Sequence, residues 1–307
     1  YKYLFGPVPS RRLGASLGVS PIPERTCNYS CVYCQLGRTL RMTNTRQEFF
    51  PLEEILAEFR EYLRGSIPFD VVTVVGEGEP TLYSRLGELI AGLKKETDKP
   101  VAVITNGALL YDAEMRRELM EADIVLPSLD AVTEEQYRKI DRPMGSIGFA
   151  EMAEGLRQFA REYQGQLWIE IMLVDGMNDS PEDIAAFKEF LGTIDYDRVY
   201  LNTPVRPPAE GFVHTSAPEH IDLAARELGG ISIDQLTSGS FFSEVEDPYE
   251  AILSIARRHP MNQFEVESFL EAREIPADQR QALMERLGQD PGITVVPYKG
   301  IITYRVN

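Results

Sequence analysis

Outside one short stretch, residues 26–37, the sequence contains no cysteine at all, and histidine is almost as scarce. A chain whose thiols are confined to one place cannot build a disulfide framework, so the class of disulfide-rich secreted domains is excluded. The three histidines lie far from the cysteines in sequence, which leaves a four-ligand zinc site open but unfavourable. They are His214, His220 and His259.

Long apolar segments are missing as well. No apolar run reaches the length of a membrane span, and we expect no signal peptide. We therefore expect a cytoplasmic protein with no membrane partner. Its 307 residues, 43% of them hydrophobic, suffice for one large domain or for one large and one small domain.

Basic residues are also fewer than acidic ones, so the formal net charge is −17. The first 47 residues are the exception, with seven Lys or Arg against the single acid Glu24. These cations, called the basic collar below, are Lys2, Arg11, Arg12, Arg25, Arg38, Arg41 and Arg46. Such a collar would attract an anionic substrate or an acidic electron donor such as a flavodoxin or a ferredoxin. The alternative is that several of these arginines are ordinary surface groups.

What the chain does have is a C-x3-C-x2-C motif formed by Cys27, Cys31 and Cys34. Three thiolates so close in sequence can converge on one metal centre. A 4Fe–4S cluster usually takes four cysteines, so here one iron would lack a protein ligand and stay open to a small molecule. Three buried, inert thiols are the alternative.

This motif, with the aromatic residue Tyr33 before its last cysteine, resembles the C-x3-C-x-aromatic-C signature of the radical S-adenosylmethionine (SAM) superfamily. The resemblance implies two cofactors, a 4Fe–4S cluster on the three cysteines and SAM on the open iron. It also implies one-electron cleavage of SAM to methionine and a 5′-deoxyadenosyl radical, which removes a hydrogen atom from a substrate. The lead-in Phe5–Gly14 and Ser16–Val19 is similar to a subgroup that includes the wyosine-type tRNA-modifying enzymes.

After the cysteines, the chain alternates between strand and helix patterns. Pro51 precedes apolar residues at 52, 55, 56, 59, 62 and 63, which is helical spacing, and the β-branched run 69–75 indicates a buried strand. We expect further strands at 101–105, 124–129, 167–174 and 198–202, and helices at 84–96, 111–121, 133–140, 147–164 and 181–192. With a short strand near Leu17–Ser20, this makes six strand–helix units and an α/β fold with a parallel sheet. Six units are too few for a closed barrel, so residues 1–240 are predicted to form a partial (β/α)6 barrel, as the resemblance also implies.

Ligands of parallel α/β folds bind where the strands end. Gly76-Glu-Gly-Glu-Pro80 follows the strand at 69–75 and resembles the family's G-G-E-P element, with Glu77 in place of a glycine. The resemblance implies that Gly78 and Glu79 contact the amino group of SAM. An ordinary turn is the alternative.

Other polar residues at strand ends are candidate contacts for SAM or substrate. Ser128 and Asp130 alternate along one strand, so their side chains share a side and suit the ribose hydroxyls. For Asp130 the alternative is a capping role at the helix that starts near Thr133. The remaining candidates are Asn106, Asn178 and Asn202.

Arg206 lies in the proline-stiffened loop Pro204–Pro208, just past the sixth strand. A guanidinium on a rigid loop suits a carboxylate or a phosphate, so we expect Arg206 to hold the carboxylate of SAM or the substrate. The alternative is a surface ion pair with Glu210.

From about residue 241 the pattern changes to helices at 247–257, 262–272 and 277–287 and a hairpin at 292–306 that turns at Tyr298-Lys-Gly300. This order predicts a winged-helix-like domain over residues 241–307. Its near-neutral charge argues against DNA as a partner and favours peptide docking, dimerisation or capping of the barrel. We expect its core at Leu253, Phe264, Phe269, Leu283 and Leu287. We also expect the SAM pocket to be built entirely before residue 210.

The sequence thus favours a radical SAM iron–sulfur enzyme acting on a small molecule, a peptide or RNA. Two alternatives stay open: a wyosine-type tRNA-modifying enzyme, and a non-catalytic iron–sulfur sensor. No second set of cysteines exists, so sulfur insertion from an auxiliary cluster is disfavoured.

Overall fold

A computed structural model describes residues 1–65, 67–233, 241–243, 245–298 and 300–307. The main sheet has eight strands in the order β1-β2-β5-β6-β7-β8-β9-β10. Strands β1 and β2 are antiparallel, and each later neighbour pairs in parallel. Their bounds are Leu4–Ser10, Gly14–Val19, Val71–Val74, Val101–Thr105, Ile124–Pro127, Gln166–Met172, Arg198–Asn202 and Ile231–Ser232. The parallel α/β architecture expected from the sequence is confirmed.

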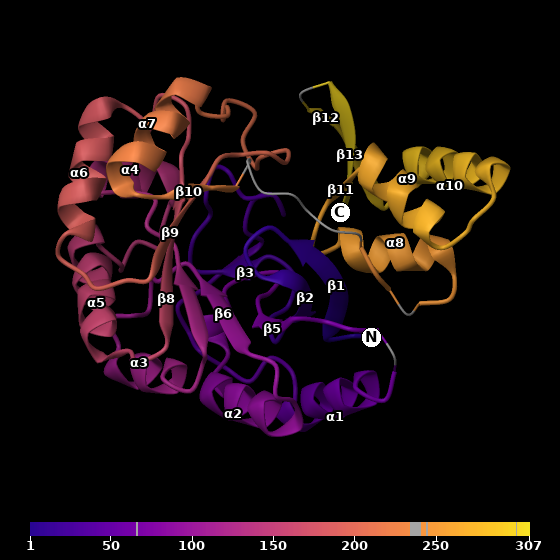
Figure 1. The fold of residues 1–307 in the computed structure, drawn as a ribbon, viewed down its shortest axis with the longest axis horizontal. Coiled ribbons are helices and arrows are strands. Elements are labelled where there is room, and N and C mark those ends of the chain that lie inside the picture. Colours follow the sequence, from indigo (N-terminus) through magenta and orange to yellow (C-terminus); the bar gives the residue numbers. More distant parts are fainter. Residues whose placement is uncertain (66, 234–240, 244, 299) are drawn as a thin grey trace.

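Helices follow the parallel strands and lie along the outer side of the curved sheet (Figure 1). They are α1 (Leu52–Tyr62), α2 (Leu86–Glu96), α3 (Ala113–Leu119), α4 (Glu134–Ile140), α5 (Phe149–Glu162), α6 (Pro181–Leu191) and α7 (Pro218–Leu228). Among these described segments, no helix has the combined length and apolar character that a membrane span requires.

Helix α1 shows how the apolar spacing becomes tertiary structure. Its buried residues are Leu52, Ile55, Leu56, Phe59 and Tyr62, which is the face that the sequence predicts. Each large side chain that leaves water contributes about 1.5–3 kcal/mol. Two glutamates in the first turn and Arg60 in the last complement the helix dipole.

Both edges of the sheet extend beyond the six predicted units. β1 contains Pro7 and Pro9, which argue against a strand in the sequence because proline donates no ladder hydrogen bond. The structure accommodates them because β1 is an edge strand that pairs with β2 alone in the main sheet. At the other edge, α7 leads to the two-residue strand β10, and neither was expected.

The C-terminal region forms a second, smaller core (Figure 1). It contains α8 (Pro248–Ala256), β11 (Met261–Asn262), α9 (Gln263–Ala272), α10 (Ala277–Gln289), β12 (Ile293–Tyr298) and β13 (Ile301–Val306). The three helices and the hairpin are confirmed, whereas β11, which adds a third antiparallel strand, was not expected. Lys299 of the expected turn lies outside the described residues. The winged-helix assignment and the boundary at residue 241 stay predictions.

One residue of the predicted C-terminal core is wrong. Phe269 and Leu287 are buried and Leu253 and Leu283 pack against them, but Phe264 is 58% exposed. The reason is helical geometry: the buried face of α9 carries Val266, Phe269 and Leu270, and a residue two positions before Val266 points to the opposite side.

Candidate functional site

A cavity of about 430 Å³ opens on the inner side of the sheet and among the loops at its carboxyl ends. A volume of this size is typical of small-molecule sites. All three cysteines line it, together with Tyr33, Gly78, Asn202 and Arg206. The structure therefore brings seven of the predicted site residues to one cavity.

Backbone hydrogen bonds shape the loop that carries the cysteines. Strand β3 (Thr26–Cys27) pairs in parallel with β4 (Arg41–Met42). The amide of Cys34 donates to the carbonyl of Cys31 at 3.1 Å, and the amide of Val32 donates to the carbonyl of Ile140 at 2.9 Å. The loop is therefore fixed at its base by β4 and at its centre by the end of α4.

The three thiols line the same cavity. Burial is the main cause that raises the pKa of each thiol, and charge on Cys34 adds to this rise at Cys27 and at Cys31. The amide of Tyr29, which donates to the sulfur of Cys27 at 3.3 Å, opposes the rise in the pKa of Cys27. Asn106 Nδ2 also donates to this sulfur, at 3.6 Å. Positive charge from Arg305 and Arg25 opposes the rise at Cys34.

These features fit an iron–sulfur cluster better than a single metal ion. Within the described part of the chain, no three His, Cys, Asp or Glu side chains converge as a mononuclear site requires. The ligands of a 4Fe–4S cluster need not converge on a single atom, because each thiolate binds a different iron. Three sulfurs that line one cavity, with N–H donors from Tyr29 and Asn106 on that of Cys27, suit such a cluster. Cys27, Cys31 and Cys34 are thus the residues that would hold it.

The loop after β5 packs directly on the cysteine loop. A β-carbon on Gly78 would lie 1.8 Å from the carbonyl oxygen of Thr26, so only glycine fits at this position. The next amide, that of Glu79, donates to the same carbonyl at 3.0 Å. The glycine in this motif is therefore required by the contact with the residue before Cys27.

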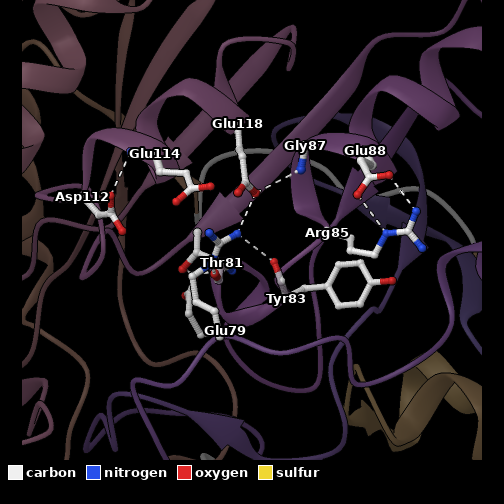
Figure 2. Close-up of polar contacts among 10 residues, drawn as sticks. Glu79, Thr81, Tyr83, Arg85, Gly87, Glu88, Asp112, Glu114 and Glu118 are labelled. Atoms are coloured by element: carbon white, nitrogen blue, oxygen red, sulfur yellow. Dashed lines mark hydrogen bonds and ion pairs between the residues drawn. The ribbon is translucent and has the colours of Figure 1, made fainter.

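Glu79 is buried, and its carboxylate ties the ends of β5 and β6 together. One oxygen accepts from the hydroxyl of Thr105 at 2.6 Å, and the other accepts from the amide of Asn106 at 2.8 Å. Thr81 donates to it through both its hydroxyl and its amide, and Figure 2 shows the two residues side by side. Burial raises the pKa of Glu79, and these hydrogen bonds oppose the rise.

The turn that follows Glu79 is clamped from outside. Arg46, a member of the basic collar, donates to the carbonyls of Thr81 and Tyr83 at 3.0 Å and to Glu118 at 2.6 Å. Glu118 also accepts from the amide of Gly87 at 3.2 Å, as Figure 2 shows. Arg46 therefore has a structural role and does not contribute to an anion-attracting surface.

Asp130 is buried and orients the aromatic residue of the cysteine motif. It accepts a hydrogen bond from the hydroxyl of Tyr33 and another, at 2.7 Å, from the amide of Met172. Burial raises the pKa of Asp130 to about 6. The alternative capping role is wrong, because Thr133 itself caps α4 by accepting from the amide of Gln136.

Of the other candidate residues, one lines the cavity and the rest do not. Asn202 lines the cavity and donates to Glu170 at 3.3 Å. Asn178 is fully buried and bonds the backbone of Val174, Met172 and Asp130. Glu79, Asn106, Ser128, Asp130 and Asn178 are not among the described lining residues. Their direct contact with SAM stays a prediction, and the side-chain partners of Glu79, Asp130 and Asn178 are those of positioning residues.

Arg206 lines the cavity, but its guanidinium is bound to the C-terminal domain. It forms a bidentate pair with Glu265 at 2.9 and 3.0 Å and donates to Nε2 of His259 at 2.6 Å. The alternative ion pair with Glu210 is wrong, because Glu210 binds Arg38 and Arg142 instead. Contact of Arg206 with SAM or substrate stays a prediction.

Comparisons with known proteins identify the family. The family model named Radical SAM superfamily matches residues 22–188, which is more than half of the chain. The chain belongs to the radical SAM superfamily. A UPF0026 protein of Methanocaldococcus jannaschii is 32% identical over 99% of this chain and 95% of its own length.

Two further proteins are similar to a smaller part of this chain. A Brachyspira hyodysenteriae protein named GTPase Obg is 43% identical over 67% of this chain, but the match spans only 30% of that protein. The crystal structure of a radical SAM methyltransferase from Sphaerobacter thermophilus aligns with a TM-score of 0.53 at 18% identity, covering 72% of this chain and 67% of that one. At this identity the likeness concerns the fold alone.

Several cavity residues of this radical SAM protein were not predicted as site residues from the sequence. Arg12, in the turn between β1 and β2, forms an ion pair with Glu170 of β8 inside the cavity. A signal for Glu170 existed, because it is the single acid within the apolar strand Leu167–Val174. Arg258 and His259 gave no comparable signal, since they follow a helix in a different part of the chain.

These residues show that the cavity extends beyond residue 210, whereas the SAM pocket is predicted to lie entirely before it; where SAM sits in the cavity stays a prediction. Arg258, His259 and Glu265 of the C-terminal domain line the same cavity as the cysteines. Arg258 lies 3.7 Å from Glu77, the residue that replaces a glycine of the family element. The C-terminal domain therefore closes one side of the cavity.

A double-mutant cycle should measure this closure. Arg206→Met and Glu265→Gln should each lower the free energy of unfolding, and the pair should show a coupling energy of about 1–3 kcal/mol, because both groups are largely buried. Arg226→Met with Glu227→Gln, an exposed pair on α7, is the matched control and should show a coupling below about 0.5 kcal/mol. Equal coupling in the two pairs would contradict a buried contact between the domains.

Proposed function

We propose that this protein is a radical SAM iron–sulfur enzyme with the partial-barrel architecture of that superfamily. The observation that carries the proposal is the single cavity shared by the three cysteines, the strand-end loop at Gly78 and the polar residues Asn202, Glu170 and Arg12. When bound there, the cluster and SAM supply one-electron cleavage of SAM to methionine and a 5′-deoxyadenosyl radical, which takes a hydrogen atom from the substrate.

The chain's own residues have separable tasks in this proposal. Cys27, Cys31 and Cys34 hold the cluster, and Asn106 and the amide of Tyr29 stabilise the Cys27 thiolate by N–H···S hydrogen bonds. Gly78 brings the strand-end backbone against the cysteine loop, where it can meet a ligand of the open iron. Glu79 keeps the ends of β5 and β6 in register from behind the cavity wall.

The ion pairs around the cavity balance positive and negative charge. Arg12 pairs with Glu170, Arg206 with Glu265 and Arg258 with Glu77. Such alternating charge suits a ligand that carries both signs, as the amino and carboxylate groups of SAM do.

The two alternatives receive less support. A tRNA substrate would need many free cations near the cavity, but Arg12 and Arg46 of the basic collar are bound to glutamates. A non-catalytic sensor would not require a cavity of about 430 Å³ beside its cluster. The substrate therefore stays open among small molecules, peptides and RNA, with RNA the least favoured.

Anaerobic assay of SAM cleavage tests the proposal. Cluster-loaded protein reduced with dithionite should form 5′-deoxyadenosine slowly without substrate, as chromatography of the products would show. Glu79→Ala should weaken SAM binding tenfold or more, because about 1.5–3 kcal/mol of charge-assisted hydrogen bonding at the strand ends is lost. Glu53→Ala, on the exposed face of α1, is the control and should leave binding unchanged. Loaded protein that neither binds nor cleaves SAM would refute the proposal in favour of a sensor.

A further inference from the structure

The segment just after the cysteine loop pairs with the residues that begin this loop. Cys27 pairs with Met42 in the ladder of β3 and β4. The amides of Leu40 and Arg41 both donate to the carbonyl of Arg25, at 3.0 and 3.1 Å. The amide of Thr43 donates to the carbonyl of Cys27 at 3.1 Å. Residues 40–43 are thus attached by their backbone to Arg25 and to Cys27, a predicted cluster ligand.

Apolar side chains of the same segment are exposed to solvent. Leu40 is 68% exposed and Met42 is 41% exposed. Phe212, from the loop after β9, is 55% exposed and lies under the guanidinium of Arg142, 5.9 Å from its ring centre. Exposed aliphatic and aromatic groups that lie among cations are typical of protein interfaces.

Positive charge surrounds these apolar groups. The side chain of Arg41 is exposed and makes no hydrogen bond or ion pair with the described residues. Arg38 and Arg142 share Glu210, but the arginine side chains are 72% and 38% exposed whereas that of Glu210 is 8% exposed. The cations therefore face solvent and the acid does not, on a chain whose net charge is −17.

We propose that Arg38, Leu40, Arg41, Met42, Arg142 and Phe212 form a docking face for an acidic one-electron carrier protein. This inference rests on the proposed function, which needs an electron for each cluster reduction. Charge complementarity selects an acidic partner, and the exposed leucine and methionine select a protein over a nucleic acid, since phosphates gain nothing from aliphatic contacts. A small face of this kind suits a brief encounter, as electron-transfer complexes require.

The geometry gives the carrier a short path to the cluster. Met42 is 41% exposed, and its ladder partner Cys27 lines the cavity, so one backbone pairing joins the exposed segment to a predicted cluster ligand. In the docked complex one electron leaves the carrier, which is oxidised by one unit, and the cluster is reduced by one unit. No bond forms or breaks and no proton needs to move between the proteins.

Stopped-flow reduction of the cluster-loaded protein by reduced flavodoxin tests the docking face. Arg41→Glu should slow reduction about three- to tenfold at low ionic strength, and the difference should fade as salt rises. Leu40→Ser should slow reduction at every salt concentration, because it removes an apolar contact. Arg226→Glu, a charge reversal at a 69% exposed arginine on α7, is the matched control and should match the unaltered protein. Dithionite, which needs no docking face, should reduce all four proteins at one rate.

A titration of oxidised flavodoxin with each protein measures docking without turnover. Arg41→Glu should weaken this binding and Arg226→Glu should not. Equal effects of the two reversals, in rate or in binding, would overturn the docking face and leave only a response to net charge. If dithionite reduces the cluster but no 5′-deoxyadenosine forms, the proposed function fails, while the binding comparison still decides whether the face receives the carrier.

Discussion

Replacing Cys31 with alanine should abolish binding of the iron–sulfur cluster. The unaltered protein, reconstituted without oxygen, should hold about four irons per chain, whereas Cys31→Ala should hold less than about one. The physical reason is the cysteine count: the chain has three cysteines, so no fourth thiol can replace the lost ligand. Iron analysis and the absorbance of the cluster provide the measurement, and SAM cleavage should fall to background.

The control for this prediction is Tyr33→Phe. It keeps the aromatic ring in the loop and removes only the hydroxyl that donates to Asp130, so it should retain close to full iron content. Circular dichroism should show that both variants fold. Binding of one tetrahedral zinc ion per chain, with no iron–sulfur absorbance, would contradict the cluster assignment.

Gly78→Ala should be the most damaging single change in the strand-end loop. Its new β-carbon would lie 1.8 Å from the carbonyl oxygen of Thr26, which is backbone and cannot swing aside. Overpacking of this kind costs about 3 kcal/mol of unfolding free energy. Since Thr26 precedes Cys27, the shift should also displace a cluster ligand, so we expect iron content and SAM affinity to fall together.

Gly288→Ala separates this local effect from a general intolerance of alanine. Apart from its chain neighbours and its own helix backbone, no heavy atom of the described residues lies within 4 Å of a β-carbon at Gly288, which is inside α10. Alanine favours a helix over glycine by about 1 kcal/mol, so this variant should be as stable as the unaltered protein or slightly more so. Thermal unfolding of the loaded proteins measures both changes. A Gly78→Ala protein with normal stability and iron content would show that the two loops are not in contact.

The sequence predicted the helices and inner strands well because their signals are local. Apolar residues at helical spacing defined α1, and a β-branched run defined β5. The edge strand β1 was missed because its prolines suppress the strand signal, although they do no harm where one side of the strand has no partner. Phe264 was misplaced because its hydrophobicity, taken alone, does not say which face of α9 it occupies.

The candidate site was predictable only in part. The cysteines and Gly78 come from short motifs whose spacing already limits what they can bind. Glu77–Arg258 and Arg206–Glu265 could not be predicted, because each pair joins residues from distant parts of the chain and neither partner carries a local pattern. Nor could the sequence say that Glu79 and Asp130 would lie behind the wall of the cavity, since a strand-end position is compatible with either side.

The sequence by itself determined which residues are the predicted cluster ligands, the alternation of strands and helices and the acidic net charge, because each of these follows from residues near one another or from composition. Only the tertiary structure decided that the C-terminal domain closes the cavity and that the segment beside Cys27 exposes Leu40, Arg41 and Met42. The physical reason is that closure and exposure depend on which distant surfaces exclude water from each other. A local pattern of residues contains no such information, whereas the packing of the two cores supplies it.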